Sequence, residues 1–366
     1  MKVSILSNLE ERSSLSFIFP ILMWEEHLKS VDIEISLFNK VCHKIYEADV
    51  LIVDSNFYRG KRAFDVNYID EEIELLSKKI KILIWYDLSD SSALDNPWPL
   101  EYVNFYIKNQ LLIDSAKYLS PIKSNGRVFS DYYISNNYVQ ESKSTDSVPV
   151  KNKNLLKKLR LGWNSCIYNG SLSNKFFIFL RKKFQIKNLI NYKISFYKPN
   201  ILRNNNCFAR FNTNYSKESI SWHRKETLKK LKNYYSSIKN EKISHRKYMS
   251  ELKNSKIVVS PFGWGEFSYR DYETFALGGL LMKPDMSHLV TWPNLYIENE
   301  TYIPYSWNLE NLIEQLENVL LKDKMRISIA EYAQENLKKY IVGKDSPELF
   351  CNQFLKIINR SNVAGI

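Results

Sequence analysis

Short apolar runs alternate with segments of helical periodicity along the first third of the chain. The runs are continuous and rich in β-branched residues, which is typical of strands buried on both faces. They are KVSIL (2–6), ADVLIVD (48–54) and KIKILIWYD (79–87). Apolar residues at helical spacing predict helices over 19–30 and 67–79, the second with Asp70 as a candidate N-cap. This alternation indicates a parallel sheet with right-handed crossovers.

The same alternation returns in the second half of the chain. Residues 136–154 are polar, contain Pro149 and lack periodicity, so they are the predicted connection between two domains. After them, strands are expected over 207–214, 256–261 and 279–284, and helices over 220–238, 245–255, 269–278, 308–321, 324–339 and 346–359.

The predicted fold class is therefore α/β, with two Rossmann-like domains that face a cleft and with helices at the C-terminus. The predicted boundaries are 1–140 for the first domain and 155–340 for the second, with a C-terminal helix over 341–366 that could pack back on the first domain. A chain of 366 residues agrees with two domains of ordinary size.

Composition points to a globular protein in a reducing compartment. The four cysteines are widely separated and form no CxxC pair, so neither a disulfide framework nor a thiolate metal site is predicted. The N-terminal residues are acidic where a secretory signal is basic, and no apolar run reaches the roughly 20 residues of a membrane span. We expect a cytoplasmic protein, with peripheral contact to the inner membrane surface left open.

Positive charge is concentrated in one part of the chain. Residues 151–260 carry 26 basic and 4 acidic side chains, whereas the segments on both sides are net acidic. Such a block attracts nucleic acid, anionic lipid headgroups or phosphorylated small molecules, and a solvated lysine-rich face is the alternative. Within it, KFFIFLRKKF (175–184) joins aromatic and basic residues as membrane-surface helices do, although burial against its own domain is favoured.

The segment SPFGWGEFSYRDYETFALGGLLMKP (260–284) contains four of the ten glycines. It begins at the carboxyl end of a predicted strand and leads into a predicted helix, where free N–H groups and the helix dipole can hold a phosphate. Gly263 and Gly265 would let the backbone approach a ligand closely. The first turn then supplies Ser268 as N-cap and Arg270 as a planar cation for phosphate oxygens.

Glu273, three residues after Arg270, could accept hydrogen bonds from two ribose hydroxyls. Together with the loop, these residues predict a site for a diphosphate and a ribose. The alternative is that Arg270 and Glu273 form a surface ion pair. Gly278 and Gly279 are predicted to end the helix.

Residues 245–307 resemble the donor-binding segment of nucleotide-sugar glycosyltransferases of the GT-B fold, especially exostosin-like and bacterial polysaccharide-cluster members. The shared pattern is S-K-x-x-x-x-P-x-G-x-G…R-x-x-E-x-x-x-x-G-G. The resemblance implies that Glu273 binds ribose, that Arg270 and Arg210 meet the diphosphate, and that the first domain takes the acceptor. The E-x7-E form of this family is not intact, because Glu266 stands seven residues before Glu273 instead of eight, so the role of Glu266 is open.

Expulsion of a diphosphate from a nucleotide sugar requires cations or helix dipoles at the leaving group. The resemblance implies that protein groups supply them, so neither a metal nor another cofactor is expected. An inverting enzyme also needs a base for the acceptor hydroxyl, and Asp87 and Asp90 follow a predicted strand of the first domain. Asp54 and His27 are further candidates, a cap or turn role is the alternative for each, and a retaining enzyme needs no such base.

These observations favour a hexosyltransferase-like enzyme that moves a sugar to a glycan or lipid-linked acceptor in surface polysaccharide or O-antigen-type biosynthesis. A nucleotide-sugar-binding protein without activity is an alternative. A nucleic-acid-binding protein that uses the basic block is a further one, but no zinc-finger spacing or RNP-like signature supports it, and no nucleic-acid partner is expected.

Overall fold

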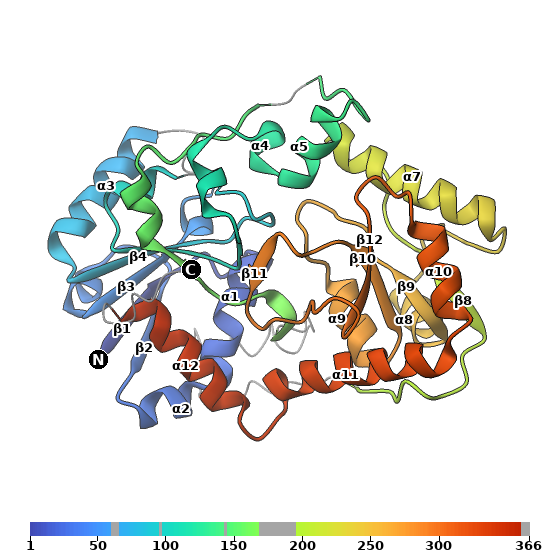
Figure 1. Ribbon diagram of the computed structural model, residues 1–366. Helices are drawn as coiled ribbons and strands as arrows, with labels where there is room; N and C mark the ends of the chain where they lie inside the picture. Colours follow the sequence, from blue (N-terminus) through green and yellow to red (C-terminus); the bar gives the residue numbers. More distant parts are fainter. Residues whose placement is uncertain (60–65, 95–96, 143–144, 168–194, 360–366) are drawn as a thin grey trace.

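The computed structural model describes residues 1–59, 66–94, 97–142, 145–167 and 195–359. They form two α/β lobes, each built around a parallel sheet, with long helices at the C-terminal end of the chain (Figure 1). The predicted fold class is confirmed. The aromatic and basic segment 175–184 lies outside the described residues.

The first lobe contains a six-stranded parallel sheet in the order β2-β1-β3-β4-β5-β7. The continuous apolar runs occupy its centre, and residues 50–53 are fully buried. Strand order reverses between β1 and β3, which in open α/β sheets creates a crevice at the carboxyl ends of the strands. The strands are β1 (Lys2–Leu6), β2 (Glu34–Phe38), β3 (Val50–Asp54), β4 (Ile82–Asp87), β5 (Phe105–Lys108) and β7 (Leu159–Leu161).

The helices of the first lobe differ in two places from the prediction. The segment 19–30 belongs to two helices that meet at Trp24, and Pro20 lies inside the first of them. Asp70 is an interior residue instead of an N-cap, because the helix begins four residues earlier, at Val66. The helices are α1 (Arg12–Met23), α2 (Glu25–Ser30), α3 (Val66–Lys79), α4 (Lys123–Gly126) and α5 (Val128–Ser135).

The second lobe contains a four-stranded parallel sheet in the order β12-β10-β9-β8. The strand predicted over 207–214 ends at Phe208, and the following residues leave the sheet to line a pocket. The strands are β8 (Asn205–Phe208), β9 (Ser255–Val259), β10 (Leu280–Pro284) and β12 (Tyr302–Tyr305), and the helices are α7 (Glu218–Tyr234), α8 (His245–Lys253), α9 (Tyr269–Leu277), α10 (Leu312–Leu320) and α11 (Asp323–Ile341).

Four elements connect the lobes. Strand β6 (Gln110–Leu112) of the first lobe pairs antiparallel with β11 (Leu289–Thr291) of the second. Strand β7 belongs to the first sheet, although it follows the predicted domain boundary at residue 155. The last helix, α12 (Ser346–Ile358), returns to the first lobe (Figure 1). There the ring of Phe350 packs 5.0 Å from those of Trp24 and Trp163.

None of the described helices combines the length and the apolar character that a bilayer crossing requires.

Candidate active site

A cleft of about 400 Å³ lies at the carboxyl ends of β3 and β4 and is closed on one side by the second lobe. It occupies the position expected from the reversal of strand order beside β3. Aromatic, hydroxyl and charged side chains share the lining, a combination suited to a polar ligand with flat apolar faces. The lining residues are Ser13, Ser55, Asn56, Tyr58, Arg59, Ile69, Trp85, Leu88, Ser89, Asp90, Trp98, Arg127 and Trp264.

Asp90 and Asp87 have different surroundings. The Asp90 side chain is exposed to the cleft, and among the described residues none donates a hydrogen bond to its carboxylate. Partial desolvation by the cleft walls raises the pKa of Asp90, against the opposing effects of Lys108 and Arg127. Of the two predicted bases, Asp90 is therefore the one that could meet a ligand in this cleft.

Asp87 is fully buried at the end of β4 and does not line the cleft. Its carboxylate lies 3.2 Å from the buried ammonium of Lys108 and accepts a 2.7 Å hydrogen bond from the hydroxyl of Tyr106. Burial by itself would raise the pKa of Asp87, but Lys108 and the hydrogen bonds hold it below its ordinary value. These contacts indicate a structural role.

The other two base candidates also lie outside the lining of the cleft. Asp54 is buried at the end of β3, where it accepts hydrogen bonds from the hydroxyl of Ser7 and, at 2.9 Å, from the amide of Phe57. Burial raises the pKa of Asp54 to about 6. His27 lies on α2. The structure therefore gives Asp54 the role of a helix cap, which was the alternative to catalysis.

A second pocket, of about 740 Å³, lies in the second lobe beside the start of α9. The segment that follows β8 forms one wall, and the segment that leads into α8 forms another. Its lining contains two arginines, aromatic side chains and several amides, which suits an anionic ligand with a ring. The lining residues are Arg210, Phe211, Asn212, Thr213, Asn214, Asn240, Glu241, Lys242, Ile243, His245, Tyr248 and Arg270.

The first turn of α9 is held by buried polar groups. Ser268 is the N-cap and forms a capping box with Asp271, which confirms the predicted start of the helix. Asp271 is fully buried, pairs with Lys283 at 3.0 Å, and accepts a 2.5 Å hydrogen bond from the hydroxyl of Ser260. The helix end that faces the pocket is therefore fixed in position.

Arg270 leaves this turn toward the pocket. Its Nη1 contacts the hydroxyl of Ser260 at 3.4 Å, and its guanidinium lies 5.7 Å from the ring centre of Phe211. Among the described residues, no acceptor pairs with the buried Nε. A guanidinium with an unused donor edge beside a helix N-terminus is a suitable partner for a phosphate.

Glu273 lies one turn further along α9. Its carboxylate accepts a 3.1 Å hydrogen bond from the hydroxyl of Tyr248 on α8. Burial raises the pKa of Glu273, whereas Tyr248 and Arg270 act in the opposite direction. Within the described part of the chain, no ion pair joins Glu273 to Arg270.

Arg210 also lines the second pocket, but it already has partners. Its guanidinium forms a bidentate ion pair with Glu251, with Nε at 2.5 Å and Nη2 at 3.2 Å from the two carboxylate oxygens, and Nη1 contacts Glu241. A diphosphate would have to compete with these carboxylates for the guanidinium. Arg210 thus lines the second pocket, but its guanidinium is already paired with carboxylates of the protein.

The two loop glycines approach protein atoms closely. A Cβ on Gly265 would lie 1.7 Å from the carbonyl oxygen of Asp90, and a Cβ on Gly263 would lie 2.9 Å from Nη2 of Arg224. Arg224 donates to the carbonyl oxygens of Phe262 and Asn212, so it joins the glycine loop to the segment after β8. Contact with the main chain of Asp90 explains glycine at position 265 without a ligand, whereas the neighbour of Gly263 is the end of the Arg224 side chain.

The remaining predicted residues of the segment have structural positions. Gly278 ends α9 in the left-handed conformation, with φ of 70°, as predicted. Glu266 is fully buried and accepts hydrogen bonds from the amide of Ser92 at 3.0 Å and from its hydroxyl at 2.7 Å. This side chain contacts the first lobe and is absent from the linings of both pockets.

The start of α1 lies between the two pockets. Arg12 stacks over the ring of Tyr269 on α9, 4.2 Å from its centre, and the next residue, Ser13, lines the cleft of the first lobe. Trp264 of the glycine loop also lines that cleft, and its carbonyl oxygen accepts a 2.9 Å hydrogen bond from Arg127. The cleft and the pocket are thus neighbours across the boundary between the lobes.

Sequence reasoning missed Tyr248, Arg127 and Trp264 as site residues. Tyr248 stands at the pocket because α8 packs beside α9, and no local signal distinguishes it from the other 23 tyrosines. Arg127 and Trp264 meet at the cleft from positions 137 residues apart in the chain. Among the described residues, no group of three or more His, Cys, Asp or Glu side chains is arranged to hold a metal ion.

No protein-family model matches the chain, and no curated protein sequence matches it. The solved structures that are similar over almost the whole chain include a glycosyltransferase from Rickettsia africae (11% identity, 98% of this chain and 97% of that chain, TM-score 0.45). They also include Anabaena Alr3699/HepE in complex with UDP-glucose, at 10% identity over 95% of this chain and 98% of that chain, with a TM-score of 0.41. A sucrose-phosphate synthase from Thermosynechococcus elongatus is similar at 9% identity over 97% of each chain, with a TM-score of 0.42. TM-scores below 0.5 do not establish a common fold, so the site rests on the contacts within this chain.

Proposed function

We propose that the protein is a glycosyltransferase that uses a nucleotide-diphosphate sugar. In this proposal the second lobe binds the donor in the pocket beside α9, and the first lobe binds the acceptor in the cleft that contains Asp90. The resemblance of residues 245–307 to GT-B glycosyltransferases of the exostosin-like type supports the same assignment.

The observation that carries the proposal is the arrangement of Arg270 and Glu273 on a capped helix end. Arg270 lines the pocket and has a buried Nε without a hydrogen-bond partner among the described residues. Glu273 is outside the lining of this pocket, and its carboxylate, one turn further along α9, forms no ion pair with Arg270 in the described structure. A nucleoside diphosphate presents the complementary groups, anionic phosphates next to ribose hydroxyls. Phe211 and Tyr248 add aromatic surface to the same pocket.

The chemistry follows from charge development during transfer. As the bond between the sugar and the diphosphate breaks, negative charge grows on the leaving group, and Arg270 with the N-terminus of α9 would stabilise it. Asp90 would accept the proton of the attacking hydroxyl if the enzyme inverts the anomeric centre. We propose that no metal is needed, so activity should persist in EDTA.

The finer assignment is a hexosyl transfer to a glycan or to a lipid-linked acceptor, within biosynthesis of a surface polysaccharide. The cleft supports a sugar acceptor, because Trp98 and Trp264 combine aromatic surface with the neighbouring hydroxyl and amide groups of Ser55 and Asn56. A lipid-linked acceptor would require work at a membrane surface, which vesicle binding can measure.

The test is a ligand screen by thermal unfolding with UDP-, GDP- and dTDP-linked sugars, and with CMP-linked sugars as monophosphate contrast. A ligand that binds the folded state raises its unfolding temperature, so one nucleotide-diphosphate sugar should stabilise the protein. Arg270→Gln should weaken that ligand by about 10- to 100-fold, the range for a lost charged hydrogen bond. Lys225→Gln, at an exposed position on α7, is the control for net charge.

The outcomes separate the alternatives. No shift with any nucleotide sugar in the wild type would overturn the proposal. A shift without release of nucleoside diphosphate in the presence of glycan acceptors would favour a binding protein without activity. Salt-sensitive binding of DNA or RNA without any nucleotide response would favour the nucleic-acid alternative.

A further inference from the structure

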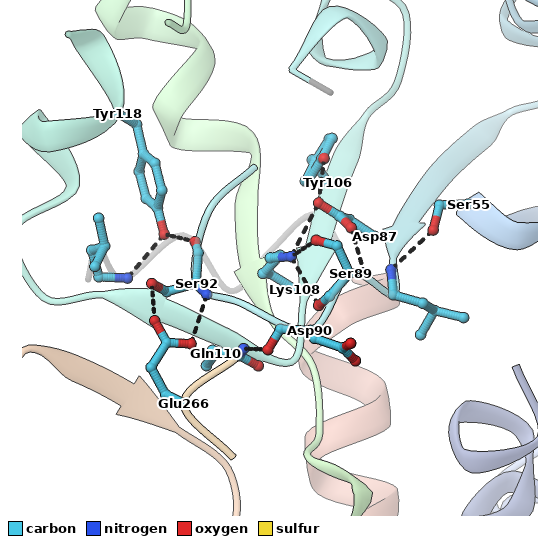
Figure 2. Close-up of polar contacts among 12 residues, drawn as sticks. Ser55, Asp87, Ser89, Asp90, Ser92, Tyr106, Lys108, Gln110, Tyr118 and Glu266 are labelled. Carbon is cyan, nitrogen blue, oxygen red and sulfur yellow. Dashed lines mark hydrogen bonds and ion pairs between the residues drawn. The ribbon is translucent and has the colours of Figure 1, made fainter. Parts of the chain in front are cut away.

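Hydrogen bonds anchor four of the five residues of the loop over residues 88–92, namely Leu88, Ser89, Asp90 and Ser92 (Figure 2). It follows β4 and forms part of the cleft wall through Leu88, Ser89 and Asp90. The anchors are hydrogen bonds from Leu88 N to Ser55 Oγ (3.0 Å), from Ser89 N to Asp87 Oδ1 (2.8 Å), from Lys108 Nζ to Ser89 O (3.2 Å), from Gln110 Nε2 to Asp90 O (2.8 Å) and from Tyr118 Oη to Ser92 O (2.9 Å).

The Asp90 carboxylate has no part in this network. No dashed line reaches it in Figure 2, and the cleft is the space into which it opens. Side chains from β5, β6 and the segment before α4 thus fix the main chain of the loop while leaving one carboxylate for a ligand. Preorganised support of this kind is what an active-site group requires.

One anchor comes from the second lobe. Both carboxylate oxygens of Glu266 bind Ser92, and both side chains are fully buried. The neighbouring Gly265 lies against the carbonyl oxygen of Asp90, where any side chain would collide. The glycine loop that leads into α9 therefore touches the Asp90 loop directly.

The buried charge of Glu266 has few compensating groups. Burial by itself would raise the pKa of Glu266, but the adjacent His288, 3.9 Å away, and the bonds to Ser92 hold it below its ordinary value. A carboxylate buried in this way is costly unless its hydrogen bonds are made. The position of Ser92 is therefore closely constrained, because its amide and its hydroxyl must both reach the Glu266 carboxylate.

We propose that Glu266 is a positioning residue for Asp90: by binding Ser92 it fixes the loop that carries the Asp90 carboxylate to the loop that leads into the donor-binding helix. The inference rests on the proposed function, because it concerns the separation of the acceptor and donor groups. It assigns to Glu266 a role between the lobes in place of a role at the donor.

The first variant of the test is Glu266→Gln, which keeps the size of the side chain and removes its charge. The second is Ser92→Ala, which removes the hydrogen bond from the Ser92 hydroxyl to Glu266 and keeps the one from the Ser92 amide. It serves as the test if Glu266→Gln does not fold. Glu300→Gln, at an exposed position, is the matched control. Hydrogen exchange of residues 88–92 should become faster in both variants and stay unchanged in the control. This readout needs no substrate.

The kinetic readout is release of nucleoside diphosphate from the donor found in the screen, at saturating donor. The variants should lose about tenfold in rate, because small displacements of a reacting group are costly, while the dissociation constant of the donor stays within about twofold. In an Asp90→Asn background, Glu266→Gln should add less than about a twofold further loss, since its effect passes through Asp90.

Three results would overturn the inference. They are unchanged hydrogen exchange of residues 88–92, a full additional rate loss in the Asp90→Asn background, and an equal loss of donor affinity. Absence of donor binding in the wild type would instead overturn the proposed function, while the exchange measurement would still decide whether Glu266 holds the loop.

Discussion

The hydroxyl of Tyr248 donates a 3.1 Å hydrogen bond to Glu273, and the guanidinium of Arg270, on the same helix, does not pair with that carboxylate within the described structure. The surface ion pair that the sequence left open is therefore not formed. An acid and a base three residues apart on a helix usually gain a few tenths of a kcal/mol, about 0.2–0.5, by pairing. Here the Glu273 carboxylate is bound by Tyr248 instead, and Nε of Arg270 has no partner among the described residues.

Replacement of Glu273 by Gln should weaken donor binding selectively for nucleotides that carry both ribose hydroxyls. The carboxylate would accept hydrogen bonds from them, and loss of charge-assisted bonds of this kind costs about 1.5–3 kcal/mol. We expect a loss of at least about tenfold in affinity for the ribose nucleotide. Isothermal titration with the matching 2′-deoxynucleotide should show a smaller difference between wild type and variant. An equal loss for both nucleotides would place Glu273 away from the ribose.

Replacement of Asp90 by Asn should remove the acidic limb of the rate profile. A base acts in its ionised form, so activity should fall as pH decreases through the pKa of Asp90, which the cleft raises above its ordinary value. The variant should lose about 10²- to 10⁴-fold in kcat, the usual contribution of a general base, with unchanged donor affinity. The measurement is kcat/KM from pH 4 to 8. A variant with wild-type activity would show that Asp90 is not the base, as in a retaining enzyme.

Replacement of Asp87 by Asn should act on stability. Asp87 and Lys108 form a buried ion pair at 3.2 Å, and removal of one partner leaves the other charge uncompensated, which costs about 3–5 kcal/mol. Urea unfolding should show this loss. The double variant Asp87→Asn with Lys108→Met should recover part of it, because no charge is then left buried. A double variant less stable than Asp87→Asn would show that Lys108 contributes mainly through Ser89.

Local signals in the sequence were sufficient for strands β1, β3, β4, β8, β9 and β10 and for the helix beside the second pocket, whereas β2, β5, β7 and β12 were not predicted. The continuous apolar run 50–53 lies at the centre of the first sheet, and Ser268 and Gly278 mark the two ends of α9. These predictions held because caps, glycine conformations and buried strands depend on residues within a few positions of one another.

The chemistry of the site depended on distant partners. Asp87 ends strand β4 and Asp90 follows it three residues later. Strand β5 brings Lys108 beside Asp87, and this contact makes Asp87 part of a buried ion pair. Arg210 has the expected position, yet Glu251, 41 residues later, occupies its guanidinium. Glycine is required at position 265 because the backbone of Asp90 lies against it, and this contact cannot be recognised from the neighbouring sequence.

Asp54 gives a pH-dependent prediction for stability. Its pKa is about 6 in the folded protein and has an ordinary value of 3.8, so the folded state binds its proton more tightly than the unfolded state. The contribution of this group to stability is therefore present below pH 4 and is lost as pH rises toward 6. Above pH 6, the free energy of unfolding is lower by at most about 3 kcal/mol than it is below pH 4 as a result of this one group.

Asp54→Asn resembles the protonated acid, because the amide can accept from the amide of Phe57 and donate to the hydroxyl of Ser7. The variant should lack this pH dependence. We expect its free energy of unfolding to gain on the wild type between pH 4 and pH 7.5, by up to about 3 kcal/mol. Urea unfolding of both proteins at each pH measures the difference, and all other titrating groups cancel in it. A constant difference between the two proteins would mean that Asp54 remains charged when folded, with the bonds from Ser7 and Phe57 outweighing its burial.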